Sequence, residues 1–305
     1  MQYAGNQLDF QERDAITIRQ PAYAQLLIDS EDRQAGQPAN DFTIYRNQAL
    51  LYGYFYRLAI TQIQFHWDLP TIVTNVNDRF YFSENNSSTN ALVIIPQGYY
   101  NPTTLAAAIQ TAIRAADANW VSYVCVFDDL TNGFVIDTGG GANIRFNFPL
   151  YEPVAYDLKN YPVLRNTARS LGITVANTIF SPTQTLAVPQ LVYTQFIDIV
   201  SRSLTKFQRV KDADTSLVNP KSFIVARLYL CPPNTAVATT ATSGIGSNPF
   251  FICVDYNTPK MIKYSPDEAL SEIDLQVLDE YGDPLYWDPI TADWSYEFTL
   301  LASES

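Results

Sequence analysis

The sequence predicts an all-β fold built from antiparallel strands. Near the C-terminus, residues 271–279 alternate strictly, with Ile273 and Leu275 on the apolar side and acidic or amide side chains on the other. After a turn at residues 282–284, residues 295–300 alternate in the same way. Apolar alternation with a period of two, interrupted by Gly and Pro, is typical of antiparallel strands that bury one face. The 20 Tyr and 17 Phe also favour sheets, whose pleated surfaces accommodate aromatic rings.

Further strands are expected in both the N-terminal and C-terminal parts of the chain. The longest spans residues 54–67, where Ile63, Phe65 and Trp67 share one side. It ends before Pro70, because Pro cannot donate a ladder hydrogen bond. The remaining strands expected here are 24–28, 42–45, 191–200, 222–230, 250–255 and 260–264.

One helix interrupts this pattern, inside a segment that reads as a separate unit. Asn101 is a favourable N-cap, and Pro102 suits the first helical position because its missing N–H would be unpaired there. Leu105, Ile109 and Ile113 follow at helical spacing. The strands expected around this one clear helix are 80–82, 92–95, 121–127 and 134–137.

These patterns predict a discontinuous β domain that carries an inserted small α+β domain. Residues 143–190, rich in Pro, Asn and Thr, have little periodicity, so we place the end of the insertion where strands resume. The expected parts are an N-terminal arm at 1–15, a β domain at 16–70 plus 191–305, and an insertion domain at 71–190.

Composition restricts the partners and the compartment. The formal net charge is -12 and neither end is a basic arm, which argues against nucleic acid because an acidic surface repels phosphates. Neither a signal peptide nor a membrane span is expected, because the N-terminus lacks an apolar h-region and no long apolar run occurs. Three widely spaced cysteines, Cys125, Cys231 and Cys253, favour reduced, mostly buried thiols.

Candidate chemical groups all have simpler interpretations. His66 is the only His, so any triad or His-containing zinc site would need it, yet it lies on the polar side of an expected strand. Residues 139–141 are three Gly without the Lys-Ser/Thr of a phosphate-binding loop, which favours a turn. Residues 212–216 begin like a calcium loop but lack its Gly and its distal Glu.

The acidic and basic clusters of the chain also have simpler interpretations. Carboxylate pairs could serve a glycosidase, but those in this chain fall at strand ends, where Asp favours turns. They are Asp128 with Asp129, and Asp279 with Glu280 and Asp283. A modest basic cluster could contact an acidic neighbour, although a solvated face is favoured; its members are Lys206, Arg209 and Lys211. The sequence therefore predicts no catalytic, cofactor-binding or metal-binding residue, and a role in assembly rather than an enzyme.

Four segments, taken in order along the chain, carry a resemblance to a known family. They are Leu27-Ile28-Asp29-Ser30-Glu31-Asp32-Arg33 followed by Asn40-Asp41-Phe42; Gly98-Tyr99-Tyr100-Asn101 with its helix; Phe196-Ile197-Asp198-Ile199-Val200 leading into Ser203-Leu204-Thr205; and the stretch from Ile273 that ends Asp279-Glu280-Tyr281-Gly282-Asp283-Pro284-Leu285. Together they resemble the minor capsid, or penton, proteins of virophages and polinton-like viruses.

The resemblance implies a single jelly roll with an inserted domain, five copies of which close an icosahedral vertex. The implied partners are further copies of the chain and a double jelly-roll major capsid protein. The implied location is the virion, after synthesis in the host cytoplasm or a virus factory. A five-fold ring would use heterologous contacts, in which one side of each subunit meets the other side of the next.

Two alternatives remain: the first belongs to another functional class, and the second keeps the viral assignment but changes the role. One is a carbohydrate-binding or glycan-hydrolysing β-sandwich, which would need exposed aromatic rings beside a carboxylate groove. A glycan array or a glycosidase panel would separate it from a capsid role. The other is a host-attachment role, for a receptor or glycan, carried by the insertion domain.

Overall fold

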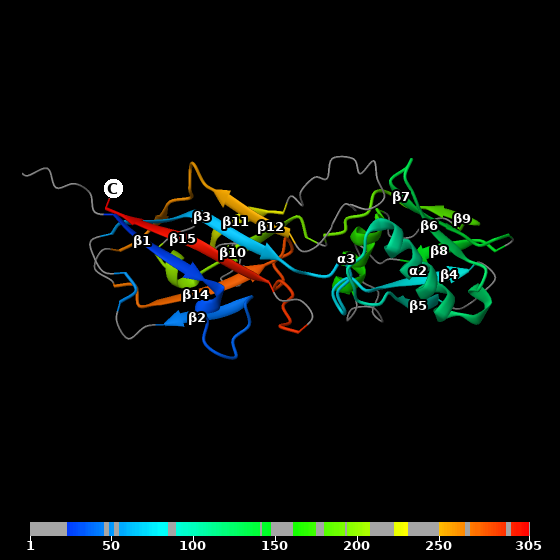
Figure 1. Ribbon diagram of the computed structural model, residues 1–305, viewed down its shortest axis with the longest axis horizontal. Helices are drawn as coiled ribbons and strands as arrows, with labels where there is room; N and C mark the ends of the chain where they lie inside the picture. Colours follow the sequence, from blue (N-terminus) through cyan, green and yellow to red (C-terminus); the bar gives the residue numbers. More distant parts are fainter. Residues whose placement is uncertain are drawn as a thin grey trace, which may run out of the picture.

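The computed structural model consists mostly of strands in antiparallel sheets with few helices, which confirms the fold class expected from the sequence (Figure 1). No helix among its described residues is long and apolar enough to cross a membrane. The described residues are 23–45, 49–51, 55–84, 90–140, 142–147, 161–174, 180–192, 194–207, 223–230, 250–265, 269–290 and 294–304.

Two sheets form a jelly roll. Their strands are β1 (Tyr23–Asp29), β2 (Asp41–Tyr45), β3 (Arg57–Trp67), β10 (Phe196–Val200), β11 (Ile224–Tyr229), β12 (Phe250–Asp255), β13 (Ile262–Lys263), β14 (Glu272–Leu278) and β15 (Ser295–Ser303). One sheet has the order β1-β15-β3-β12, with β13 also paired to β3, and the other has the order β11-β10-β14-β2. In a jelly roll, the first and last strands lie side by side in one sheet, and the second and second-last strands lie side by side in the other. Here β1 pairs with β15, and β2 pairs with β14.

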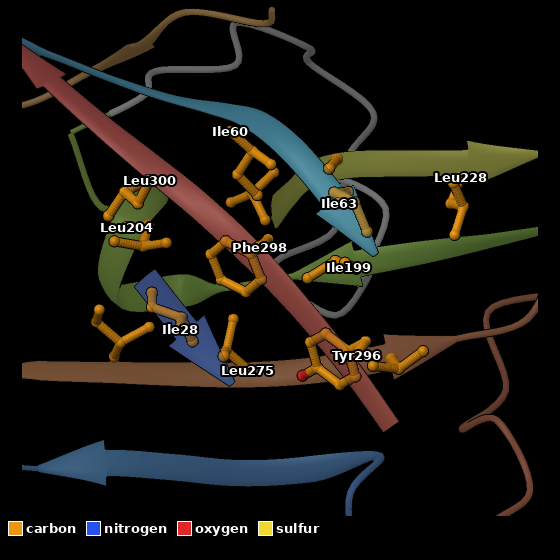
Figure 2. Close-up of a cluster of buried hydrophobic side chains, with 14 of the residues drawn as sticks. Ile28, Ile60, Ile63, Ile199, Leu204, Leu228, Leu275, Tyr296, Phe298 and Leu300 are labelled. Carbon is orange, nitrogen blue, oxygen red and sulfur yellow. The ribbon is translucent and has the colours of Figure 1, made fainter. Parts of the chain in front are cut away.

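The alternating faces read from the sequence fill the space between these sheets. Leu275 on β14 and Phe298 on β15 both point into the core, although their strands lie in different sheets (Figure 2). Ile63 and Phe65 on β3 are fully buried there. The core thus explains the period of two in each strand, because each strand turns one face inward and the other outward.

A second hydrophobic core is formed by the chain between β3 and β10. Its elements are β4 (Arg79–Glu84), β5 (Asn90–Ile94), α2 (Pro102–Ala116), β6 (Val124–Asp128), β7 (Gly133–Asp137), β8 (Ile144–Asn147), α3 (Tyr161–Leu171) and β9 (Thr183–Thr185). They make two three-stranded sheets, β5-β4-β8 and β6-β7-β9, and the core draws on residues from Ile72 to Leu191. We call these elements the second unit; that they are a separate inserted domain stays a prediction.

The helix predicted at residue 102 is confirmed with its cap, but the prediction of a single clear helix is wrong. The Asn101 side chain accepts the Thr104 N–H at 2.8 Å. The helix that was missed is α3, whose buried residues Leu164, Ala168 and Leu171 do keep helical spacing. Polar residues are buried beside them, among them Thr167 and Ser170, which hides the apolar stripe. The two short strands β8 and β9 were missed as well.

Asp274 fixes the short helix α4 (Arg202–Thr205) against β14. Its carboxylate accepts the Ser203 N–H at 2.7 Å, the Ser201 hydroxyl at 3.0 Å and the Arg202 N–H at 3.1 Å. Burial opposes its ionisation, but the hydrogen bonds from Ser203, Arg202 and Ser201 prevail and lower the pKa of Asp274. A pKa below the unfolded value means that ionised Asp274 stabilises the fold.

We expect Asp274→Asn to lower the free energy of unfolding at neutral pH by about 1–2 kcal/mol, since charge-assisted bonds are lost. The stabilisation from Asp274 is present above its unfolded pKa and is lost as pH falls through the folded pKa. The difference between wild type and variant should therefore close below about pH 4. Chemical denaturation at several pH values checks this, and a difference independent of pH would contradict it.

Candidate assembly surfaces

The side chains that were candidates for catalysis or metal binding lie on different elements of the fold. His66 is exposed on the outer side of β3, and Asp128 holds the β6–β7 turn by accepting the Thr131 hydroxyl at 2.8 Å and the Leu130 N–H at 3.1 Å. These bonds, the one from the Thr131 hydroxyl above all, lower the pKa of Asp128. Within the described residues, no three His, Cys, Asp or Glu side chains are placed to hold a metal ion.

The cysteine prediction is half right. Cys125 is buried, and burial raises the pKa of its thiol to about 12, so it is an inert packing residue. Cys253 is exposed, contrary to the expectation of mostly buried thiols, because it lies on the outward side of β12. The candidates outside the described residues are Arg209, Lys211, residues 212–216 and Cys231.

The acidic cluster that follows β14 builds a turn. Asp279 is 4% exposed and accepts the Tyr281 N–H at 2.9 Å and the Asp283 N–H at 3.0 Å. Burial raises the pKa of Asp279, and those hydrogen bonds act against that rise. The carboxylate therefore shapes residues 279–283 locally, as Asp does in many turns.

This turn connects the jelly roll to helix α3 of the second unit. The Arg165 guanidinium lies 3.3 Å from the Tyr281 ring centroid, and Arg169 donates a hydrogen bond to the Tyr281 hydroxyl at 2.7 Å. Ion pairs join Arg165 to Asp283 at 3.4 Å and Arg169 to Glu280. We call these five residues the joint, since they link the two cores through charge and ring stacking.

We expect Tyr281→Ala to loosen the joint without unfolding either core. The variant loses cation–π contacts worth about 0.5–2 kcal/mol, while both hydrophobic cores stay intact. Small-angle X-ray scattering should give a larger radius of gyration and a broader distance distribution than wild type. Tyr281→Phe, which keeps the ring and loses only the hydroxyl, is the matched control and should resemble wild type. A scattering profile unchanged in Tyr281→Ala would contradict the role of the joint.

A partly buried ion pair, with Asp198 buried and the Arg227 side chain 35% exposed, lies on the outer face of the β11-β10-β14-β2 sheet. Asp198 is 2% exposed and accepts two hydrogen bonds from the Arg227 guanidinium, at 2.7 and 2.8 Å. The hydrogen bond that Arg227 donates to Asp198 raises the pKa of Arg227. The guanidinium also lies 3.9 Å from the Phe196 ring centroid, and Phe196 packs edge-on against exposed Tyr229. This cluster ties β10 to β11 across the sheet.

Side chains close both edges of that sheet. At the β11 edge, the Tyr256 hydroxyl donates to the Arg227 carbonyl at 2.8 Å, and Lys260 Nζ donates to the Ile224 carbonyl at 2.6 Å. At the β2 edge, the Gln37 side chain accepts the Thr43 N–H at 3.1 Å. Capped edges disfavour extension by strand addition, so partners are expected to meet side-chain faces.

The sequence did not predict the contacts of the joint or of the Asp198–Arg227 ion pair, because the partners are far apart along the chain; Glu280 and Asp283 were assigned only to a turn. Arg165 and Asp283, for instance, are separated by 118 positions. The available signal was a charge inside an apolar strand: Asp198 interrupts the run Phe196–Val200. A charge in such a run indicates a buried partner.

No protein-family model and no curated protein matches the chain. Among solved structures it is similar to the mavirus penton protein, with 13% identity and a TM-score of 0.49, over 93% of this chain and 99% of that chain. It is also similar to a chain in the structure of the Sputnik virophage, with 13% identity and a TM-score of 0.41, over 93% of this chain and 98% of that one.

Proposed function

We propose that this chain is a minor capsid, or penton, subunit, and that five copies close each icosahedral vertex of a virus particle. The observation that carries the proposal is the strand order of one jelly roll, a fold of capsid and lectin domains. Figure 1 shows the second unit at one end of the jelly roll, so it does not cover the outer faces of the two sheets. We propose that these faces contact neighbouring subunits.

In this role the chain is a structural protein and not an enzyme, and it uses no cofactor. Its partners are further copies of itself and a double jelly-roll major capsid protein around the vertex. Its location is the virion, after synthesis in the host cytoplasm or a virus factory. The net charge of -12 suits a shell protein that does not bind the genome directly.

Labelling of purified particles with an antibody against the chain tests the vertex location. Electron microscopy should find the label at the vertices. Label spread over the facets, or particles that lack the chain, would contradict the proposal.

The second unit adds a further candidate role, attachment to a host receptor or glycan. We propose that residues 71–190 are a separate inserted domain whose position at one end of the jelly roll suits a surface projection. Deleting them, and then measuring assembly and cell binding separately, distinguishes a domain that supports neighbouring subunits from an attachment domain. Loss of cell binding with assembly retained supports attachment, while loss of assembly alone supports a role in holding neighbouring subunits.

A further inference from the structure

One face of the jelly roll carries a pair of exposed cations beside an exposed tyrosine. Tyr23 on β1, Arg57 on β3 and Lys263 on β13 belong to one cross-strand row, linked through Ser303 on β15. Their neighbours in the next row, such as Leu58 and Ile262, point into the core, so these three point outward. Tyr23 is 65% exposed, and Arg57 and Lys263 are exposed too. We call Tyr23, Arg57 and Lys263 the basic patch.

The opposite sheet carries exposed acids beside another tyrosine. Tyr45 on β2 lies directly across from Glu272 on β14, and both point away from the core. Asp41, at the start of β2, is on the same face and accepts a hydrogen bond from Gln276 at 3.2 Å. Tyr45 is 55% exposed, and Asp41 and Glu272 are exposed. We call Asp41, Tyr45 and Glu272 the acidic patch.

The charges of the two patches are not neutralised within the described part of the chain. Arg57, Lys263 and Glu272 form no ion pair with any described residue. Within the described residues, Arg57, Lys263 and Glu272 are therefore available to pair with charges on a partner.

Arg57 of the basic patch and Glu272 of the acidic patch also lie at the same end of the jelly roll, whereas Asp41, paired with Gln276, lies nearer the joint. β3 runs from Arg57 toward Trp67, after which Ile72 enters the second core, so Arg57 is at the far end. β14 runs from Glu272 toward the joint, so Glu272 is at the far end as well. Figure 1 places both ends opposite the second unit. A closed ring needs two different surfaces at the same level on opposite sides of the subunit.

We propose that the basic patch of one copy contacts the acidic patch of the next copy around the ring. This inference rests on the proposed penton function and assigns its subunit contact. Complementary charges would fix the register of neighbours, and the two tyrosines would supply contact area, as Tyr commonly does at interfaces. The contact would be head-to-tail, which a chain of five needs in order to close.

Charge reversal with rescue tests the contact by light scattering over a concentration series. Glu272→Lys places a cation opposite Arg57 and Lys263, and we expect the concentration for half-dissociation of the ring to rise about tenfold or more. Glu272→Lys also lowers the net negative charge of each subunit. Weaker general repulsion between subunits would stabilise the ring, which is the opposite of the effect expected here. Adding Lys263→Glu to Glu272→Lys restores an opposite pair and should restore the ring.

The matched control is Asp129→Lys, an exposed acid in the β6–β7 turn that changes the net charge by the same amount outside both patches. It should assemble as wild type does. Each variant should keep the wild-type circular dichroism spectrum and melting temperature, because Glu272, Lys263 and Asp129 are exposed.

The outcomes separate this contact from the penton function. A wild-type pentamer that Glu272→Lys leaves intact, or that the double variant fails to restore, overturns the contact while the penton proposal stands. A wild-type chain that forms no ring overturns the penton proposal and the contact together. The penton function and the contact are both supported if Glu272→Lys weakens the ring, the double variant restores it and Asp129→Lys has no effect.

Discussion

Replacing Phe65 with alanine should lower the free energy of unfolding of the jelly roll by about 3–5 kcal/mol, the usual cost of deleting a buried aromatic ring. Phe65 is fully buried, and its ring centroid lies 5.2 Å from that of Trp294 and 6.0 Å from that of Tyr296. Removing the ring leaves a cavity between two sheets that cannot collapse freely. Chemical denaturation followed by tryptophan fluorescence measures the change.

The matched control is Phe251→Ala on the adjacent strand. Phe251 is 59% exposed on the outer face of the same sheet, so its loss should change stability by less than about 0.5 kcal/mol. Equal effects for Phe65→Ala and Phe251→Ala would mean that the assigned inward and outward faces of β3 and β12 are wrong.

Removing Arg227 should also destabilise the jelly roll. In Arg227→Ala the Asp198 carboxylate loses its cation, which costs about 3–5 kcal/mol in a fully buried pair; because the Arg227 side chain is 35% exposed, water can partly replace it and we expect about 1–3 kcal/mol. The paired change Asp198→Leu with Arg227→Met replaces both charges by apolar groups and should cost less than Arg227→Ala alone. Denaturation of the single and double variants gives the comparison. A double variant less stable than Arg227→Ala would show that the charges themselves stabilise the fold.

Sequence patterns predicted most of the jelly roll because its strands have one solvent-facing and one buried face. The second half of β3, β14 and the first part of β15 alternate cleanly, and each has its apolar side in the same core. The sequence did not show which of these strands pair, because the alternating pattern of a strand is the same whichever strand lies beside it. β14 and β15, consecutive in the chain, lie in different sheets.

The segment after residue 141 was the poorest prediction, for a physical reason. Helix α3 buries polar side chains such as Thr167, whose hydroxyl accepts the Arg79 N–H at 3.3 Å, and Ser170, which accepts from Asn77 at 2.9 Å. Polar groups satisfied by distant partners look solvent-facing in the sequence. The same limit hid the joint and the two patches, because each joins residues that only the folded chain brings together.

The measurement that tests the central proposal most directly is the absolute mass of the purified protein, by light scattering on a sizing column across salt and protein concentrations. The account predicts a five-fold multiple of the 34.3 kDa chain, stable at low salt and weakened as salt screens exposed charges. A trimer, or a monomer at every concentration, would contradict it.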